Sequence, residues 1–129
     1  MNGVEDAWAS SSQRERPAVT NTSDSHLQAT LTALGDPVER LRFTGEAETY
    51  ITWQTIAGSE AAFADDDNEE YEHLYRVDLF SKFNYVEKLV ELRKALKAAA
   101  FYGTQVLAEQ YESDTGLYHA SLNTNFLEV

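Results

Sequence analysis

Residues 71–82 read YEHLYRVDLFSK, and with the following FNYVEKLVELRKALKAA at 83–99 they decide the fold. Side chains in the first stretch alternate between two sides, Leu74, Arg76, Asp78 and Phe80 against Tyr75, Val77, Leu79 and Ser81. A two-residue period among β-branched and aromatic residues predicts a strand.

The second stretch predicts an amphipathic helix that begins after Asn84. The Asn84 side chain can accept from a free amide of the first turn, and Glu87 can reach back to complete a capping box. Apolar residues then recur at helical spacing, at Tyr85, Leu89, Leu92, Leu96 and Ala99. A strand followed by a helix that packs back on it through its leucines is therefore the expected core.

Composition narrows the class of protein. A chain of 129 residues with 43% apolar residues makes one domain with a real core. The absence of cysteine excludes a disulfide framework, a thiolate metal site and a cysteine nucleophile. A net charge of −12 argues against binding the phosphate backbone, and no apolar run has membrane-spanning length.

Residues 1–23 are polar, with Trp8 as their only large apolar side chain. Such a segment buries too little surface to offset the entropy of ordering it, so a flexible N-terminal arm is expected, followed by a single domain at 24–129. A second interpretation is an arm that becomes ordered against a neighbouring chain, with Trp8 as its anchor.

The other predicted elements surround this core. They are a short helix from Asp24 or Ser25 to Leu34, a weak strand at 38–43, and strands at 49–56, 101–112 and 117–129. Short links favour antiparallel neighbours. The sequence predicts an α+β fold, with an antiparallel sheet of four to five strands and one long and one short helix on one face.

Between two strands, residues 58–70 lack apolar periodicity and contain a block of carboxylates, Asp65, Asp66, Asp67, Glu69 and Glu70. Acidic residues stand at alternate positions, at Asp65, Asp67 and Glu69, as they do at the start of a calcium-binding EF-hand loop. The sixth position is Glu70 rather than glycine, however, and the twelfth is Arg76 rather than glutamate. A solvated acidic loop is the expectation.

No histidine belongs to a metal-ligating or nucleophile motif, so no catalytic residue, cofactor or metal ligand is predicted. Asp78 is the notable carboxylate, because a charged residue inside the main strand needs a partner. The partner of Asp78 could be Arg76, Lys82 or a group across a subunit boundary. We therefore expect Asp78 to be structural, or to lie at a subunit contact with Lys82.

Several stretches in fixed order resemble a family. YITWQ at 50–54, the acidic block, VDLFSK at 77–82 with the helix after it, and YESDTGLYH at 111–119 resemble the tail-completion, or tail terminator, proteins of tailed bacteriophages. The resemblance covers about Leu27 to Phe126. Where the family typically has a glycine before a phenylalanine, this chain has Ala100.

The resemblance implies a non-enzymatic virion protein that forms a six-fold ring at the head-proximal end of the tail. Its partners would be other copies of itself, the tail tube protein and a neck or head-completion protein, with assembly in the host cytoplasm. DNA would pass through without specific binding, and a negative lumen would repel it; the acidic block is the candidate lumen lining.

Two other functions are open. A small acidic protein can mimic DNA and inhibit a DNA-binding protein. Such a mimic needs carboxylates spread over one face, whereas here they are gathered in one loop. A hydrolase or metal enzyme has little support in these residues.

Overall fold

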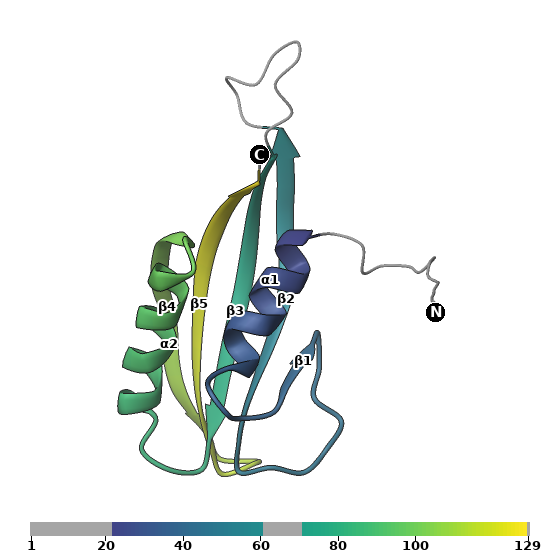
Figure 1. The fold of residues 1–129 in the computed structure, drawn as a ribbon. Helices are drawn as coiled ribbons and strands as arrows, with labels where there is room; N and C mark the ends of the chain where they lie inside the picture. The colour runs from purple at the N-terminus through teal and green to yellow at the C-terminus, as the bar shows by residue number, and fades with distance from the viewer. Residues whose placement is uncertain (1–21, 61–70, 129) are drawn as a thin grey trace, which may run out of the picture.

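The computed structural model describes residues 22–60 and 71–128 (Figure 1). Two helices and five strands follow one another as α1 (Thr22–Thr32), β1 (Val38–Arg40), β2 (Thr49–Glu60), β3 (Tyr71–Ser81), α2 (Val86–Ala98), β4 (Tyr102–Glu112) and β5 (Leu117–Glu128). This confirms the predicted α+β class with one longer and one shorter helix. Trp8 and the acidic block lie outside the described residues, so their predicted roles stay predictions.

The five strands form one sheet in the order β1-β2-β3-β5-β4. The pairs β2–β3, β3–β5 and β4–β5 are antiparallel, whereas β1 pairs with β2 in parallel, with Val38 opposite Ile51. The prediction of antiparallel neighbours is therefore wrong at this edge. Leu41 turns sharply at φ 70° and ends β1 after three residues, and residues 42–48 carry the chain back so that β2 runs the same way.

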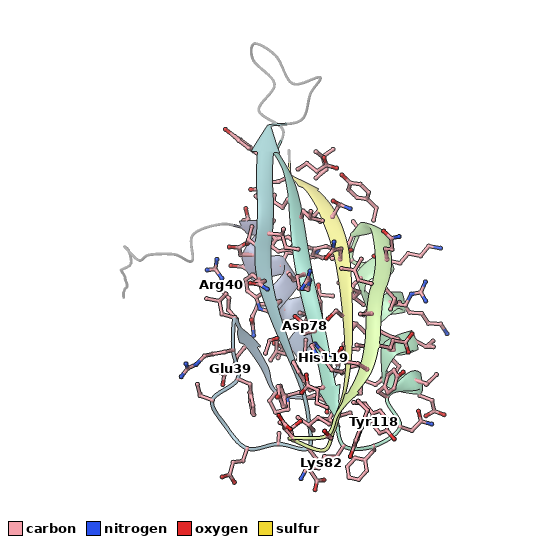
Figure 2. All side chains as sticks on the ribbon, turned by 180° about the vertical axis from the view of Figure 1, so that it is seen from behind. Glu39, Arg40, Asp78, Lys82, Tyr118 and His119 are labelled. Atoms are coloured by element: carbon pink, nitrogen blue, oxygen red, sulfur yellow. The ribbon has the colours of Figure 1, made fainter. Side chains whose placement is uncertain are left out.

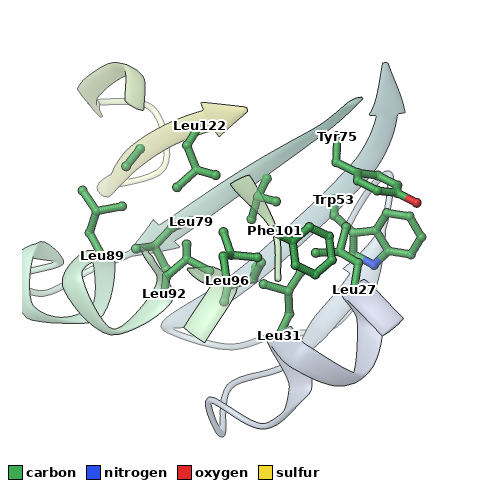
Figure 3. Close-up of a cluster of buried hydrophobic side chains, with 13 residues drawn as sticks. Leu27, Leu31, Trp53, Tyr75, Leu79, Leu89, Leu92, Leu96, Phe101 and Leu122 are labelled. Carbon is green, nitrogen blue, oxygen red and sulfur yellow. The ribbon is translucent and has the colours of Figure 1, made fainter. Parts of the chain in front are cut away.

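Both helices lie on the same face of the sheet (Figure 1). Leu27 and Leu31 of α1 and the predicted leucines of α2, Leu89, Leu92 and Leu96, are buried. They pack on strand residues that include Ile51, Trp53, Tyr75, Val77, Leu79 and Leu122 (Figure 3). The alternation that predicted β3 thus decides which of its side chains enter the core.

Two helix boundaries differ from the prediction. Helix α2 begins at Val86 with Tyr85 as its cap residue, and Asn84 Oδ1 accepts from the Val86 amide at 2.9 Å. The cap residue therefore lies one position later than predicted. In place of the predicted capping box, the Asn84 side chain accepts from the amide two residues further on, as in an Asx turn. Helix α1 begins at Thr22, before the predicted end of the arm, because buried Ser23 lies 2.6 Å from the Tyr75 hydroxyl.

Strand β2 also continues past the predicted end at 56 as far as Glu60, paired with Tyr71. A register shift between Thr55 and Ala57 absorbs one extra residue, which interrupts the alternation on which the prediction depended. Neither helix of the described part has the length and apolarity of a membrane span.

Candidate interaction surface

The sheet face opposite the helices is not covered by any helix or strand of the described residues (Figure 2). Asp78 of β3 and His119 of β5 lie at the middle of this open face, and Lys82 lies at one end of it (Figure 2). Tyr118 lies at the same end of the sheet but on the helix side, where its ring is 5.6 Å from that of Tyr85. The same alternation that sends Val77 and Leu79 into the core sends Asp78 to this face. Polar and aromatic side chains therefore meet here with no packed layer over them.

Asp78 is the centre of a polar network. Its Oδ1 lies 2.8 Å from His119 Nε2 and accepts a hydrogen bond of 2.5 Å from Ser121 Oγ. The second ring nitrogen, His119 Nδ1, lies 3.1 Å from Glu112 Oε2. The Asp78 and His119 side chains are only 13% and 17% exposed, so the pair is largely shielded from water.

The expectation that Asp78 has a partner is confirmed, but neither Arg76 nor Lys82 is that partner. Pairing of β3 with β5 places Ser121 directly opposite Asp78, with His119 opposite Phe80. Arg76 lies two residues further along the strand opposite Asn123, and Lys82 is exposed beyond the strand's end. The sequence gives no sign of which strand pairs with β3, so the true partner could not be read from it.

Aromatic rings form a row across the open face. Phe43 stacks on Tyr50 with ring centroids 4.3 Å apart, and Tyr50 stacks on Phe80 at 4.7 Å. Phe80 stacks on His119 at 4.1 Å, so the row ends at the polar network. Burial raises the pKa of Tyr50, and the Glu112 carboxylate raises it further. The phenol therefore stays neutral beside these carboxylates.

The network also resembles the triad of a hydrolase, with Ser121 in the place of the nucleophile, His119 of the base and Glu112 of the orienting acid. Ser121 Oγ lies 3.2 Å from His119 Nε2. An activated serine gives its proton to the base, whereas Ser121 donates to Asp78. Ser121 also lies inside β5 between β3 and β4, where backbone amides are engaged in the two ladders rather than free to stabilise an oxyanion. The arrangement suits a structural link between strands.

The aromatic end is a cluster at one end of the sheet, on the helix side, around a shallow cavity of about 350 Å³ lined by Lys82, Phe83, Asn84, Tyr85 and Tyr118. The Tyr118 ring lies 5.6 Å from Tyr85 and 5.0 Å from the neighbouring Tyr111. Phe83 is 56% exposed and Tyr111 57% exposed. Large aromatic side chains held in water at one site are typical of protein-binding surfaces.

The Tyr85 hydroxyl donates to the Glu109 carboxylate, and this bond is the main cause of the raised pKa of Tyr85. It links the residue that caps α2 to β4. The aromatic end is thereby fixed from both the helix and the strand. A rigid aromatic surface loses little entropy when it binds a partner.

The two motifs VDLFSK at 77–82 and YESDTGLYH at 111–119 lie side by side in the sheet. Asp78 and Phe80 of the first contact His119 of the second on the open face, and Ser81 pairs with Tyr118 across the strands on the helix side. Motifs separated by an entire helix in the chain thus become neighbours. No group of three acidic or histidine side chains in the described part of the chain is placed to hold a metal ion.

No protein-family model matches the chain, and no curated protein matches it either. Among solved structures, a chain of the virion of a native gene transfer agent particle is 16% identical, with a TM-score of 0.44 over 75% of this chain and 82% of that one. A chain of an extracellular contractile injection system, the PVC sheath/tube terminator in the extended state, is 9% identical. Its TM-score is 0.43 over 89% of this chain, which spans 58% of that chain's length.

Proposed function

We propose that the protein is a non-enzymatic component of a phage virion that forms a six-fold ring at the head-proximal end of the tail. The ring would end the tail tube and join it to the neck. One observation carries this proposal. The two motifs on which the resemblance to tail-completion proteins depends come together at one surface, where Asp78 lies 2.8 Å from His119.

A ring of identical subunits needs two different surfaces on each copy, because contacts between neighbours are head-to-tail. The aromatic end meets the requirements for one of them. Phe83 and Tyr111 are exposed, and Lys82 lies beside them, so apolar contacts would be surrounded by charge. Lys82 and Asp78 therefore remain our proposed contact region for a neighbouring copy, the tail tube protein or the neck protein.

The second part of the proposal concerns the lumen. Residues 65–70 carry five of the chain's carboxylates, as Asp65, Asp66, Asp67, Glu69 and Glu70. Placed around the channel of a ring, they would repel DNA and let it pass without binding. This placement follows from their charge and is part of the proposal.

The test is the mass and shape of the intact protein. Native mass spectrometry of the full chain, with electron microscopy of the same sample, should give closed rings of about six copies. A matched pair of variants sharpens the test. Phe83→Ser at the aromatic end should reduce ring formation, whereas Ala33→Ser, exposed at the end of α1, should not.

A monomer or dimer that tightly binds a DNA-binding protein would contradict the ring and support the DNA-mimic alternative instead. Rings that form equally well with Phe83→Ser would leave the ring in place and exclude the aromatic end as a subunit contact.

A further inference from the structure

A second surface lies away from the open face, between α2 and the start of β4. It is a groove of about 520 Å³, lined by Val90, Arg93, Lys94, Lys97, Phe101, Tyr102, Gly103 and Thr104. We call it the basic groove. It is separate from the aromatic end and shares no residue with it.

The charge of the groove is opposite to that of the chain. Arg93, Lys94 and Lys97 are three of the ten cationic side chains in a protein of net charge −12. All three are exposed and none forms an ion pair with another described residue, whereas Lys88 on the same helix pairs with Asp36 at 2.8 Å. The groove is therefore a local positive site with charge available for a ligand.

The rest of the groove is apolar. Phe101 is buried at its base, while Val90 and Tyr102 remain 45% and 43% exposed. The Tyr102 hydroxyl donates to Glu72, which fixes the ring at the groove's edge. A complementary ligand would therefore combine an apolar or aromatic side chain with carboxylates next to it.

The chain itself contains such a segment. Residues 4–8 read VEDAW, with Glu5 and Asp6 immediately before Trp8. We propose that Val4–Trp8 of a neighbouring copy docks in the basic groove, with Trp8 against Phe101 and Tyr102 and the two carboxylates against the cations. This inference rests on the proposed ring and names the contact that links one copy to the next.

The length of chain allows this contact. Helix α1 begins at Thr22, and His26 in that helix stacks on Phe101 at 5.3 Å, so the arm leaves the fold near its own groove. Residues 9–21 can extend up to about 45 Å, which is enough to reach beyond a small domain to the next one. One arm and one groove on each copy make a head-to-tail contact that can close into a ring.

Charge favours an exchange between copies. Identical chains of net charge −12 repel one another, so an interface between them needs local pairs of opposite sign. The groove offers three cations to two carboxylates of the next copy. The acidic residues 65–70 could also be attracted to it, but that segment is joined at both ends to β2 and β3, which restricts its reach.

The absence of cysteine allows a direct test with the full-length chain. Copies carrying Ala7→Cys are mixed with copies carrying Val90→Cys, oxidised mildly, and analysed on non-reducing gels and by mass spectrometry. Native mass is measured on the same mixtures before oxidation. The matched control replaces Val90→Cys by Ala33→Cys, which is exposed directly after α1 and does not line the groove.

The expected result is a disulfide between Ala7→Cys and Val90→Cys copies, formed at least about tenfold faster than with the Ala33→Cys control. Reversing the groove charge with Lys94→Glu and Lys97→Glu should slow it roughly tenfold, as expected for lost charge pairs replaced by repulsion. Adding Glu5→Lys and Asp6→Lys to the arm should restore the rate of disulfide formation. Circular dichroism is the check that each variant is folded.

Rings with no preference for Val90→Cys over the control would overturn the inference and leave the proposed function intact. So would a disulfide that forms equally well when Ala64→Cys takes the place of Ala7→Cys, or a double variant with both cysteines on one chain that links only within single chains. Specific linkage between two copies that never close into a ring would instead support the docking contact and contradict the proposed function.

Discussion

The Asp78 carboxylate and the His119 imidazole lie 2.8 Å apart on the sheet face that no helix covers. Asp78 belongs to β3 and His119 to β5, so the pair joins adjacent strands whose positions in the chain are separated by α2 and β4. With its neighbours Ser121 and Glu112, the pair places four polar side chains in one network on this face, next to the stacked ring of Phe80.

Replacing Asp78 by Asn tests whether this network stabilises the fold. Asparagine keeps the shape and can still accept from Ser121, but it loses the charge that faces His119. We expect the free energy of unfolding in urea to fall by about 1–3 kcal/mol, the cost of weakening a shielded, charge-assisted hydrogen bond. Glu112→Gln is the control, since its side chain is 30% exposed, and it should cost less than half as much. Equal losses for the two variants would contradict a special role for Asp78.

The leucine face of α2 gives the largest expected effect. Leu92 is fully buried against the sheet, so Leu92→Ala should lower the free energy of unfolding by about 2–5 kcal/mol, through lost burial and the cavity left behind. Val90→Ala on the same helix is the control, because Val90 is 45% exposed, and it should change stability by less than about 0.5 kcal/mol. Denaturant titration measures both, and a small effect of Leu92→Ala would contradict the packing described.

Tyr75 should make stability depend on alkaline pH. Burial raises its pKa well above the ordinary value of 10.0, and its hydrogen bond to Asp24, 2.7 Å long, raises it further. The unfolded chain therefore releases this proton at a lower pH than the folded chain. The contribution of Tyr75 to stability is complete below pH 10 and declines as the pH rises above it. In Tyr75→Phe, the free energy of unfolding should decline less steeply above pH 10 than in the unmodified protein, and parallel slopes would contradict this prediction.

Much of this fold could be predicted because local patterns and packing agree. The alternation around Val77 and the leucine spacing around Leu92 each describe a single buried face, and the structure buries both. What could not be predicted depends on contacts between distant segments. The parallel pairing of β1 and the start of α1 at Thr22 depend on such contacts, because Ser23 is held by Tyr75 of β3.

The candidate surface shows the same limit. Asp78 could be recognised as a charge that needs a partner, but His119 is its partner only because β5 inserts between β3 and β4. The aromatic end was missed for a related reason. Phe83 lies in the link between β3 and α2, whereas Tyr111 belongs to β4 and Tyr118 to β5, and no pattern along the chain shows that the three gather at one end.

The end of α2 provides a further prediction. Ala100 adopts the left-handed region at φ 75°, and the Phe101 amide donates to the Leu96 carbonyl at 2.9 Å, as in a Schellman motif. The resemblance places a glycine here, and glycine avoids the cost of a side chain in this conformation. Ala100→Gly should therefore raise the free energy of unfolding by about 0.5–1 kcal/mol. Ala98→Gly, at the last residue of the helix, should lower it by up to a similar amount, so effects of the same sign would contradict the assignment.

The final prediction separates the two proposed roles of the segments outside the described residues. Replacing Asp65, Asp66 and Asp67 by asparagine removes three charges that repel one another, so the free energy of unfolding should change by less than about 0.5 kcal/mol. If these residues line the channel, particles should still form but release DNA more slowly, because the lumen repels DNA less. Head–tail joining is scored by electron microscopy of purified particles, and DNA delivery by infection or by triggered release.

Deletion of residues 1–21 is the matched comparison, since it removes the arm and leaves α1 complete from Thr22, with Ser23 still beside Tyr75. Loss of the arm should reduce joining, because it removes the proposed contact between copies, while particles that do join should deliver DNA normally. The two variants therefore have opposite expected outcomes in the same two assays. Normal joining without the arm, together with normal delivery after the three acids are neutralised, would contradict both proposed roles while leaving the fold and its open face unaffected.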